Sequence, residues 1–472
     1  MSYNKVSSDT ELTLTATARP NAFWIVIALS LGFVMAMLDV TVVNVALTKI
    51  EHDFDAPLSL LVWVVDAYTL TFAALLLLGG SVADRLGAKR TYMLGLLWFI
   101  VASGLCAFAS SGALLVGARL LQGIGAAMFM PSSLSLLTQS FPDKSERAKL
   151  LGIWGAIVGA AAGAGPFIGG LLVSSFGWRS IFYLNIPIGI AGALLTAKFL
   201  SASPKKIHPF DAGTHALIML CLSAFSFALI QGPTLGWSSF NILVTICVAI
   251  AALIVVVCRE RIAIHPVIPR SLSTNPRFWA FNAMGFSINV ALFGQIFLLS
   301  LYLQKALGAS ALVTGIYLLP VMCFISIFNV RSGHLSNRWG LTTVLGIGLG
   351  TASFGALIAA FAGANVPYWI LVIPLGISNA GLGLALPAMS SGMMQEAGSA
   401  DGNVAAAALN ANRQVGALSG VAVIGIMLVL VDSWLWRMRI GFALFSFCLA
   451  LACVMTWLSD RRQAESHSHA IK

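Results

Sequence analysis

The stretch GSVADRLGAKR, from Gly80 to Arg90, returns later in the chain in shorter form as GHLSNRWG, from Gly333 to Gly340. Each stretch separates two long apolar runs. The matching positions, with Asp84 replaced by Asn337, are Gly80 and Gly333, Arg85 and Arg338, and Gly87 and Gly340. A loop repeated at equivalent places indicates a duplicated unit, and its two positions determine how the chain divides.

The composition identifies the apolar runs as membrane spans. The chain is 58% hydrophobic and only 9% charged, with a mean hydropathy of +0.91, whereas a soluble domain carries roughly a quarter charged residues. Runs of about 20 apolar residues suffice to cross a bilayer as a helix. They predict fourteen spans: Ala22–Leu47, Leu58–Gly80, Thr91–Ala109, Leu114–Leu137, Leu150–Ser174, Ile181–Phe199, Ala212–Gln231, Phe240–Cys258, Phe278–Leu303, Val313–Val330, Leu341–Ala362, Tyr368–Met389, Gly402–Val431 and Ile440–Leu458.

The repeated loop follows the second and the tenth predicted span, so the spans divide as six, two and six. We therefore predict an all-α membrane protein made of two pseudo-symmetric six-helix bundles with an inserted two-helix hairpin. Internal repeats are typical of secondary transporters, whose substrate site lies near the bilayer midplane between the halves. The predicted parts are a tail at 1–21, a bundle at 22–199, the linker and hairpin at 200–277, a bundle at 278–458 and a tail at 459–472.

The basic residues predict the orientation. Most of the 27 lysines and arginines fall on the side of the membrane that holds both termini, and basic loops are typical of the cytoplasmic side. The termini are therefore predicted to be cytoplasmic, and the net charge of +10 has the same origin. Scattered over short loops, these charges do not form the clustered face that nucleic-acid binding requires. The opposite side has only Lys49, Arg179, Lys305, Arg437 and Arg439, and Arg119 and Arg413 fall inside spans.

Two carboxylates lie inside apolar spans. Asp39 lies eight residues before the predicted end of the first span, and Asp66 eight residues after the start of the second. At 1.5 Å per residue, both lie about 12 Å inside the same membrane face. A carboxylate at mid-membrane costs about 2.5 to 3.5 kcal/mol, so it seldom faces lipid.

We predict that Asp39 and Asp66 face one cavity. Two carboxylates in one cavity of low dielectric constant are coupled in their protonation, so a proton and an organic cation would compete for the same negative charge. That competition is antiport in its simplest form. The alternative is purely structural, with Asp39 bonded to backbone or to Asn44 and Asp66 bonded to a neighbouring hydroxyl.

Several motifs resemble the major facilitator superfamily, specifically its fourteen-helix drug:proton antiporters. The stretch from Gly80 resembles the signature loop between helices two and three. RLLQGIGAAMFMP, from Arg119, resembles the helix-four motif, and Trp63-x-x-Asp-x-Tyr68 resembles the exporters of quaternary ammonium compounds, dyes and biguanides. Further matches are GAIVGAAAGAGPFIGG (Gly155 to Gly170), GWRSIFYLNIPIG (Gly177 to Gly189) and NANRQVGALSG (Asn410 to Gly420).

The resemblance implies roles for three sets of residues. It implies that Arg119 takes part in proton coupling, the alternative being a structural bond to helix-end carbonyls. It implies a cytoplasmic latch that breaks when the protein opens inward, at Gly80, Asp84, Arg85, Gly87, Lys89 and Arg90. It also implies that the helix-five motif sets the exporter's conformational preference, through Gly155, Gly159, Gly163, Gly165, Pro166, Gly169 and Gly170.

For the helix-five motif, physical chemistry adds a packing prediction. The spacing of Gly155, Gly159 and Gly163 lets a second helix approach closely along one stripe, and Pro166 bends the helix that carries them. The candidate lining of the substrate cavity is aromatic, soft or amide-bearing, which suits promiscuous binding and organic cations. Its members are Met35, Trp63, Tyr68, Phe286, Asn289, Phe293 and Phe297.

The sequence therefore predicts a proton-driven multidrug antiporter in the cell membrane that exports lipophilic, mainly cationic compounds by alternating access. Its partners would be those compounds, protons and membrane lipids, and we expect a monomer without metal or cofactor. No cluster of catalytic groups indicates an enzyme. Two alternatives stay open, an exporter of a neutral or anionic metabolite and a non-transporting receptor or scaffold. An exporter of anions would need basic residues in its cavity.

Overall fold

The computed structural model describes residues 21–141, 143–203, 211–263, 266–362 and 367–470. Among these residues the secondary structure is helical and contains no strand. Fourteen segments are long and apolar enough to cross a membrane, which confirms the predicted number. The first half comprises α1 (Ala22–Phe54), α2 (Leu58–Leu86), α3 (Ala88–Ala107), α4 (Gly112–Ser140), α5 (Lys144–Phe176) and α6 (Ser180–Phe199).

The hairpin and the second half follow along the chain. The hairpin is α7 (Ala212–Leu235) and α8 (Phe240–Ile262), and the four-residue helix α9 (Arg270–Ser273) lies in the linker after it. The second half comprises α10 (Pro276–Leu301) with its π-helical extension η1 (Tyr302–Ala306), α11 (Ala311–Trp339), α12 (Leu341–Ala362), α13 (Tyr368–Leu430) and α14 (Trp434–Ala470).

Two of these helices differ from the predicted spans. Helix α13 consists of two helical spans, Tyr368–Gly398 and Val404–Leu430, which meet at a kink at Gly398 where φ is +65°, a conformation that glycine adopts without strain. The last helix, α14, continues to Ala470, past Leu458 where the last span was predicted to end.

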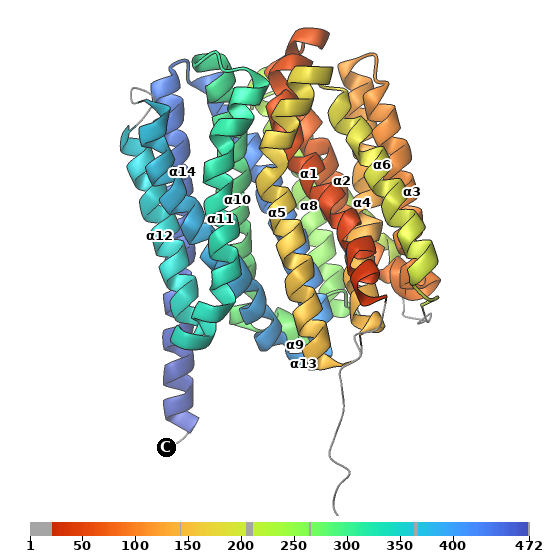
Figure 1. The fold of residues 1–472 in the computed structure, drawn as a ribbon. Helices are drawn as coiled ribbons and strands as arrows, with labels where there is room; N and C mark the ends of the chain where they lie inside the picture. The colour runs from red at the N-terminus through yellow and green to blue at the C-terminus, as the bar shows by residue number, and fades with distance from the viewer. Residues whose placement is uncertain (1–20, 142, 204–210, 264–265, 363–366, 471–472) are drawn as a thin grey trace, which may run out of the picture.

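The repeat that divides the sequence is visible in the backbone. Helix α2 ends at Leu86 and is followed by Gly87 with φ of +92°, and α11 ends at Trp339 and is followed by Gly340 with φ of +86°. These two glycines terminate equivalent helices in the same unusual conformation. In Figure 1 the first half and the second half lie side by side as two bundles of steeply inclined helices.

The helices are arranged as two bundles joined along two seams. Helix α1 packs on α5 and α6, and α4 packs on α2 and α3; in the second half, α13 packs on α10, α11 and α12. Helix α5 meets α11 along the first seam, and α2 meets α13 along the second. The hairpin covers the second seam, because α7 packs against both α2 and α13 while α8 packs mainly against α7.

An ion pair fastens one end of the hairpin. Asp211 precedes α7 and accepts hydrogen bonds from the backbone N–H of Thr214 (3.1 Å) and from Arg259 Nη2 of α8 (3.0 Å to each oxygen). Bonds from the Thr214 hydroxyl and backbone, followed by those from Arg259, lower the pKa of Asp211 to about 2. The carboxylate thus caps α7 and ties it to α8.

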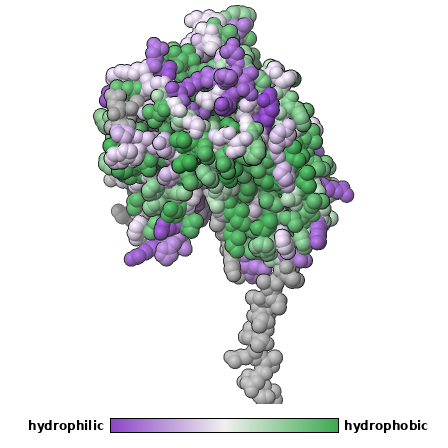
Figure 2. All heavy atoms as spheres, turned by 45° about the horizontal axis from the view of Figure 1, so that its top comes forward, coloured by the Kyte–Doolittle hydropathy of each residue, from purple (hydrophilic) through white to green (hydrophobic). Residues whose placement is uncertain are grey.

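The start of α1 and the end of α14 lie at the same end of the molecule (Figure 1), here called the terminal end; the other is the distal end. The two halves are bonded together at the distal end. Lys305 Nζ lies 2.7 Å from Glu51 Oε1, and Thr48 bonds Gln304. Figure 2 shows the surface continuous across the distal end and notched between two lobes toward the terminal end. The halves are therefore closed distally and apart at the terminal end.

Candidate functional site

A buried ion pair lies inside the first half. Arg119 of α4 donates from Nη1 to Asp39 Oδ2 of α1, and each side chain is 1% exposed. Arg119 Nε also donates to the carbonyl of Val64 on α2, at 2.9 Å. This intramembrane arginine therefore has a carboxylate partner in the interior, and the pair links three helices.

Amide side chains complete the coordination of Asp39. Gln122 Nε2 donates to Oδ1 at 2.9 Å, and Asn185 Nδ2 of α6 donates to the same oxygen at 3.0 Å. The Gln122 carbonyl oxygen accepts from Arg119 Nη1 at 2.7 Å, and Ser103 Oγ of α3 accepts from Gln122 Nε2 at 2.9 Å. The carboxylate thus has three N–H donors, and four helices are joined by one polar network.

Local sequence explains this placement. Arg119 and Gln122 lie three residues apart, so they project from the same face of α4. Helix α4 approaches α2 closely at Gly123, because glycine has no side chain. A Cβ at this position would collide with Thr71 Oγ1 and the carbonyl of Tyr68. The ring of Tyr68 then lies under the guanidinium, with Arg119 Cζ 4.7 Å from the ring centroid, a cation–π contact.

Asp66 occupies a different environment. It is fully buried, and neither carboxylate oxygen has a hydrogen-bond partner among the described residues. One turn before it on α2, Val62 lies against Gly425 of α13, whose Cβ would be 2.8 Å from Val62 Cγ2. Asp66 therefore lies on the side of α2 that faces the seam between the halves.

The structure does not bring Asp39 and Asp66 together, which corrects the prediction of one shared cavity. Both are inside the membrane region, but Asp39 is bonded into the interior of the first half and Asp66 lies near the seam. Nor does Asn44 bind Asp39, since its amide donates to the carbonyl of Val40. The physical reason is the position of Arg119, because its charge draws Asp39 toward α4.

Most of the predicted cavity residues lie in helix contacts. Met35 and Phe297 are completely buried in the packed cores of the first and second halves. Trp63 lies beside Phe227 of the hairpin, with ring centroids 6.4 Å apart, and Tyr68 lies under Arg119. Of the predicted set, Trp63, Phe286 and Phe293 are half-buried, while Asn289 is buried. In this conformation Met35, Tyr68 and Phe297 are buried in helix contacts, and their place in a substrate cavity stays a prediction.

The helix-five motif makes the predicted close contact at a different place. A Cβ on Gly170 would collide with the carbonyl of Ala311, and one on Gly315 of α11 with the carbonyl of Pro166. Gly163 also meets α11, since its Cβ would lie 2.9 Å from Ser326 Oγ. Gly165 and Gly169 instead face α1, against Thr41 and Val42, and Gly155 and Gly159 have open space where a Cβ would lie.

The helix-five contacts show how the seam opens. The distal part of α5 touches α11 backbone to backbone. Further toward the terminal end, Ser326 of α11 lies against Gly163 and donates from Oγ to the carbonyl of Gly159 at 3.3 Å. The predicted stripe is therefore in contact at Gly163 and Gly159, and a Cβ on Gly155 would meet open space. The two helices diverge toward the terminal end, in agreement with the notch in Figure 2.

The predicted latch residues form the end of α2 and the start of α3. Gly80, Asp84 and Arg85 are helical, and Gly87 makes the turn. Lys89 donates from Nζ to the carbonyls of Ala197 (3.3 Å) and Leu200 (2.5 Å) at the end of α6, and Arg90 is exposed. Asp84 has no bond to a described residue, so a latch across the seam is not engaged at this acid.

Sequence reasoning missed Gln122, Asn185 and Ser103. Gln122 lies in the motif that begins at Arg119 and Asn185 in the stretch from Gly177 to Gly189, but an isolated amide in an apolar run gives no indication of its partner. Their positions relative to Asp39 depend on the packing of α1, α3, α4 and α6. A signal was available for Gln122, because it lies one turn after an arginine that needed a partner.

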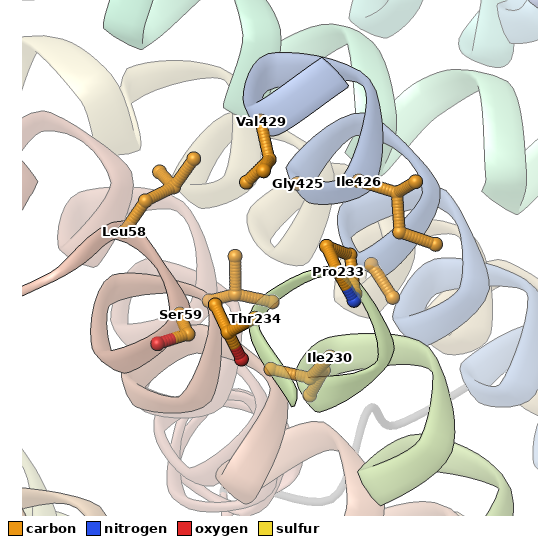
Figure 3. Close-up of a pocket in the computed structure, with 10 residues that line it drawn as sticks. Leu58, Ser59, Ile230, Pro233, Thr234, Gly425, Ile426 and Val429 are labelled. Atoms are coloured by element: carbon orange, nitrogen blue, oxygen red, sulfur yellow. The ribbon is translucent and has the colours of Figure 1, made fainter. Parts of the chain in front are cut away.

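The distal part of the seam beside the hairpin contains a small hollow (Figure 3). Leu58, Ser59 and Val62 come from α2, and Ile230, Pro233 and Thr234 from α7. The remaining wall belongs to α13, with Ala422, Gly425, Ile426 and Val429. Three structural units therefore meet at one point, one turn from Asp66.

Two repeated helical halves, joined along two seams and enclosing charged groups, define the class of secondary membrane transporters. The chain belongs to the Major Facilitator Superfamily, whose family model matches residues 29–421. The predicted resemblance is thereby confirmed. The protein is a multi-pass membrane protein of a transporter family rather than an enzyme.

Relatives in this superfamily carry drug-resistance names. The methylenomycin A resistance protein of Bacillus subtilis (strain 168) is 45% identical, over 92% of this chain and 93% of the relative. The methylenomycin A resistance protein of Streptomyces coelicolor is 43% identical, over 91% and 90%. The multidrug resistance protein Stp of Mycobacterium tuberculosis (strain CDC 1551 / Oshkosh) is 32% identical, over 87% and 76%.

Proposed function

We propose that this protein is a proton-driven antiporter of the cell membrane that exports lipophilic, mainly cationic drugs such as quaternary ammonium compounds, dyes and biguanides. The drug-resistance names of its relatives support export of drugs. The observation that carries the coupling is Asp66, a buried carboxylate with both oxygens unpartnered among the described residues.

Burial makes the ionised form of Asp66 energetically unfavourable. An ionised carboxylate held in the membrane interior without a partner costs several kcal/mol. A proton or an organic cation removes that cost by neutralising the charge. Since one carboxylate accepts only one of the two, binding of a proton favours release of the cation. This exchange at Asp66 replaces the two-carboxylate exchange that the sequence suggested.

The Asp39–Arg119 pair supplies a second coupling element. Asp39 is bonded by Arg119, Gln122 and Asn185, so a proton reaches this carboxylate only by displacing the guanidinium. The freed Arg119 would then have to find other acceptors, among them the Val64 carbonyl it already contacts. Protonation of Asp39 would thus loosen the joint between α1 and α4 and change how the first half packs.

The closed distal end assigns the state. If the termini are cytoplasmic, as the basic residues predict, the notch toward the terminal end opens inward, and it supports our proposal that this conformation is the inward-facing state. Export then requires separation of the distal contacts and closure of the terminal end. Rocking of the two halves about the α5–α11 contact provides that movement.

A second candidate function is favoured by one observation. The half-buried Arg413 of α13 is not ion-paired among the described residues, and a basic group in the cavity is what an exporter of anionic compounds requires. Export of a neutral or anionic compound on the same scaffold therefore stays a candidate.

The test is transport by the purified protein in proteoliposomes with an imposed pH gradient. Ethidium should move against its own gradient, release protons on addition, and stop moving when nigericin collapses the pH difference. Ethidium transport that ignores the proton gradient would contradict the proposal. Transport of anionic but not cationic dyes would favour the second candidate.

A further inference from the structure

Arg413 is an unpaired cation in the interior of the second half. Its Nη1 donates to Asn410 Oδ1 at 3.3 Å, and its Nε is buried without a hydrogen-bond partner among the described residues. It lies nine residues into the span Val404–Leu430, which places its Cα about 13 Å from the terminal end of that span. A charged side chain at such depth marks a substrate or ion path in membrane proteins.

The second-half helices α10, α11 and α12, which pack on α13, supply no counter-ion. Helices α10, α11 and α12 contain neither aspartate nor glutamate. The two acids of α13 are engaged elsewhere, because Glu396 bonds Asn275 and Arg277 and Asp401 bonds Ser271. The contrast with Arg119, which has an aspartate within bonding distance, indicates that the partner of Arg413 comes from outside the chain.

A buried acceptor-bearing amide lies next to Arg413. The Cγ of Arg413 packs on Gly285 of α10, 3.1 Å from where a Cβ would lie. The amide of Asn289 donates to the carbonyl of the same Gly285 at 2.8 Å. Asn289 is 1% exposed, and its Oδ1 is unpartnered among the described residues. The Nε donor of Arg413 and the Oδ1 acceptor of Asn289, both without partners among the described residues, therefore lie on either side of Gly285.

Arg413 lies at the edge of the side of α13 that packs on α10, and its guanidinium extends to Asn410. Ile426 lines the hollow beside the hairpin, and Asn410 lies about 160° around the helix axis from it at 3.6 residues per turn. Gly416, against Phe286, marks the side that packs on α10. Asn410 is exposed, so the face it shares with Arg413 is reached from the open terminal end.

We infer that Arg413 binds the carboxylate of lipophilic acids, which are a second class of exported compounds besides the cations. The guanidinium presents two parallel N–H donors that match a carboxylate. The Asn289 oxygen is free to accept from a hydroxyl or amide of the same compound, and the half-buried rings of Phe286 and Phe293 offer an apolar wall. The inference rests on the proposed function, since it names a further substrate class for the same cavity.

Two dyes test the inference in the full-length protein. Fluorescein carries a carboxylate and ethidium is a cation, and proteoliposome transport is measured for both. Arg413→Gln should lower fluorescein transport at least tenfold and leave ethidium transport within twofold. Arg413→Lys should give an intermediate loss, because lysine keeps the charge without the paired donors. Arg261→Gln, an exposed arginine of the hairpin, is the matched control and should change neither rate.

Asn289→Asp gives an independent arm. An aspartate beside Gly285 supplies an internal partner for Arg413, so fluorescein transport should fall while folding is retained. Fluorescence polarisation of fluorescein with detergent-purified protein adds a readout that needs no proton gradient. Polarisation should report binding by the wild type and at least tenfold weaker binding by Arg413→Gln.

The outcomes separate this inference from the proposed function. Fluorescein binding that does not depend on Arg413, or equal loss of both dyes in Arg413→Gln, overturns the inference and makes Arg413 structural. Failure of the wild type to carry fluorescein while it carries ethidium also overturns it. Arg413-dependent binding without any proton-driven transport supports the binding site and contradicts the proton-coupled exporter instead.

Discussion

Arg119 and Asp39, 80 residues apart in sequence, form an ion pair in which each side chain is 1% exposed. Its surroundings differ sharply from those of Asp66, which is equally buried and has no bonded partner among the described residues. Neutralising Asp39 should therefore affect stability differently from neutralising Asp66. Variants of the two acids can distinguish an effect on folding stability from an effect on transport.

Removal of one partner of the pair should destabilise the fold. Arg119→Gln leaves Asp39 buried with only its amide donors, and breaking a buried pair in this way costs about 3–5 kcal/mol. The thermal unfolding temperature of the purified protein should fall clearly. The double variant Asp39→Asn with Arg119→Gln should recover much of that temperature but not proton-driven transport. Unchanged thermal stability in the single variant would contradict a structural contribution of the pair.

Removal of the Asp66 charge should have the opposite profile. Asp66→Asn takes away an uncompensated charge, so the unfolding temperature should stay the same or rise, while cation-dependent proton release is lost. Asp55→Asn is the matched control. Asp55 lies at the distal end of α1 with φ of +46°, which asparagine tolerates. Full proton coupling in Asp66→Asn would exclude Asp66 from the mechanism.

The contact between α5 and α11 should not tolerate side chains. Gly170→Val places two methyl groups against the backbone of Ala311, and overpacking of this kind costs about 1–3 kcal/mol. Transport should be lost because the halves no longer meet. Gly104→Val is the control, since no atom lies within 4 Å of its Cβ position. Normal transport by Gly170→Val would show that the contact is dispensable.

The distal ion pair should bias the conformation by its charge. Glu51→Lys puts two cations together and should increase chemical labelling of a cysteine placed at Thr48, in a background without the native cysteines. The exchanged pair Glu51→Lys with Lys305→Glu should restore the protection. A partly exposed pair is worth only about 0–1 kcal/mol, so the expected change is a shift in labelling rate rather than loss of folding. Equal labelling of all three proteins would contradict this gating role.

The hairpin fastening should survive acid. The pKa of Asp211 is lowered to about 2 by Thr214 and Arg259. A carboxylate whose folded-state pKa is depressed contributes stability that is fully present above its unfolded pKa, near 3.8, and is lost as the pH falls toward 2. Once corrected for the intrinsic pH dependence of exchange, hydrogen-exchange protection of the first turn of α7 should be equal at pH 7 and pH 5. Asp211→Asn should lower it at both.

The sequence was sufficient for the fold because span length and the repeated loop are local signals. Gly87 and Gly340 appear in the structure as helix-ending residues in the same conformation, as the repeat implied. The number of spans depends only on the lengths of the apolar runs, which are read directly from the order of residues. The two spans of α13 are likewise separate runs in the sequence, and they meet at a kink at Gly398.

The site was predictable only in part, for a physical reason. Burial cost alone identifies Asp39, Asp66 and Arg119 as interior residues. Which acid pairs with Arg119 depends on helix rotation, and a rotation of α2 by one residue moves a side chain by 100°. Met35 and Phe297 could not be placed from the sequence for the same reason, since an apolar residue fits a core, a cavity or lipid equally well.

The crossing of α5 and α11 at Gly170 and Gly315 has a mechanical consequence. No side chain lies between the two backbones at this crossing, so the helices cannot come closer together there. The crossing can therefore serve as the pivot about which α5 tilts relative to α11. Along α5, Gly155 lies about 22 Å from Gly170 at 1.5 Å per residue. If α5 tilts by about 15° at Gly170, Gly155 moves by about 6 Å. A small change in helix angle at the distal end therefore widens the opening between the halves at the terminal end.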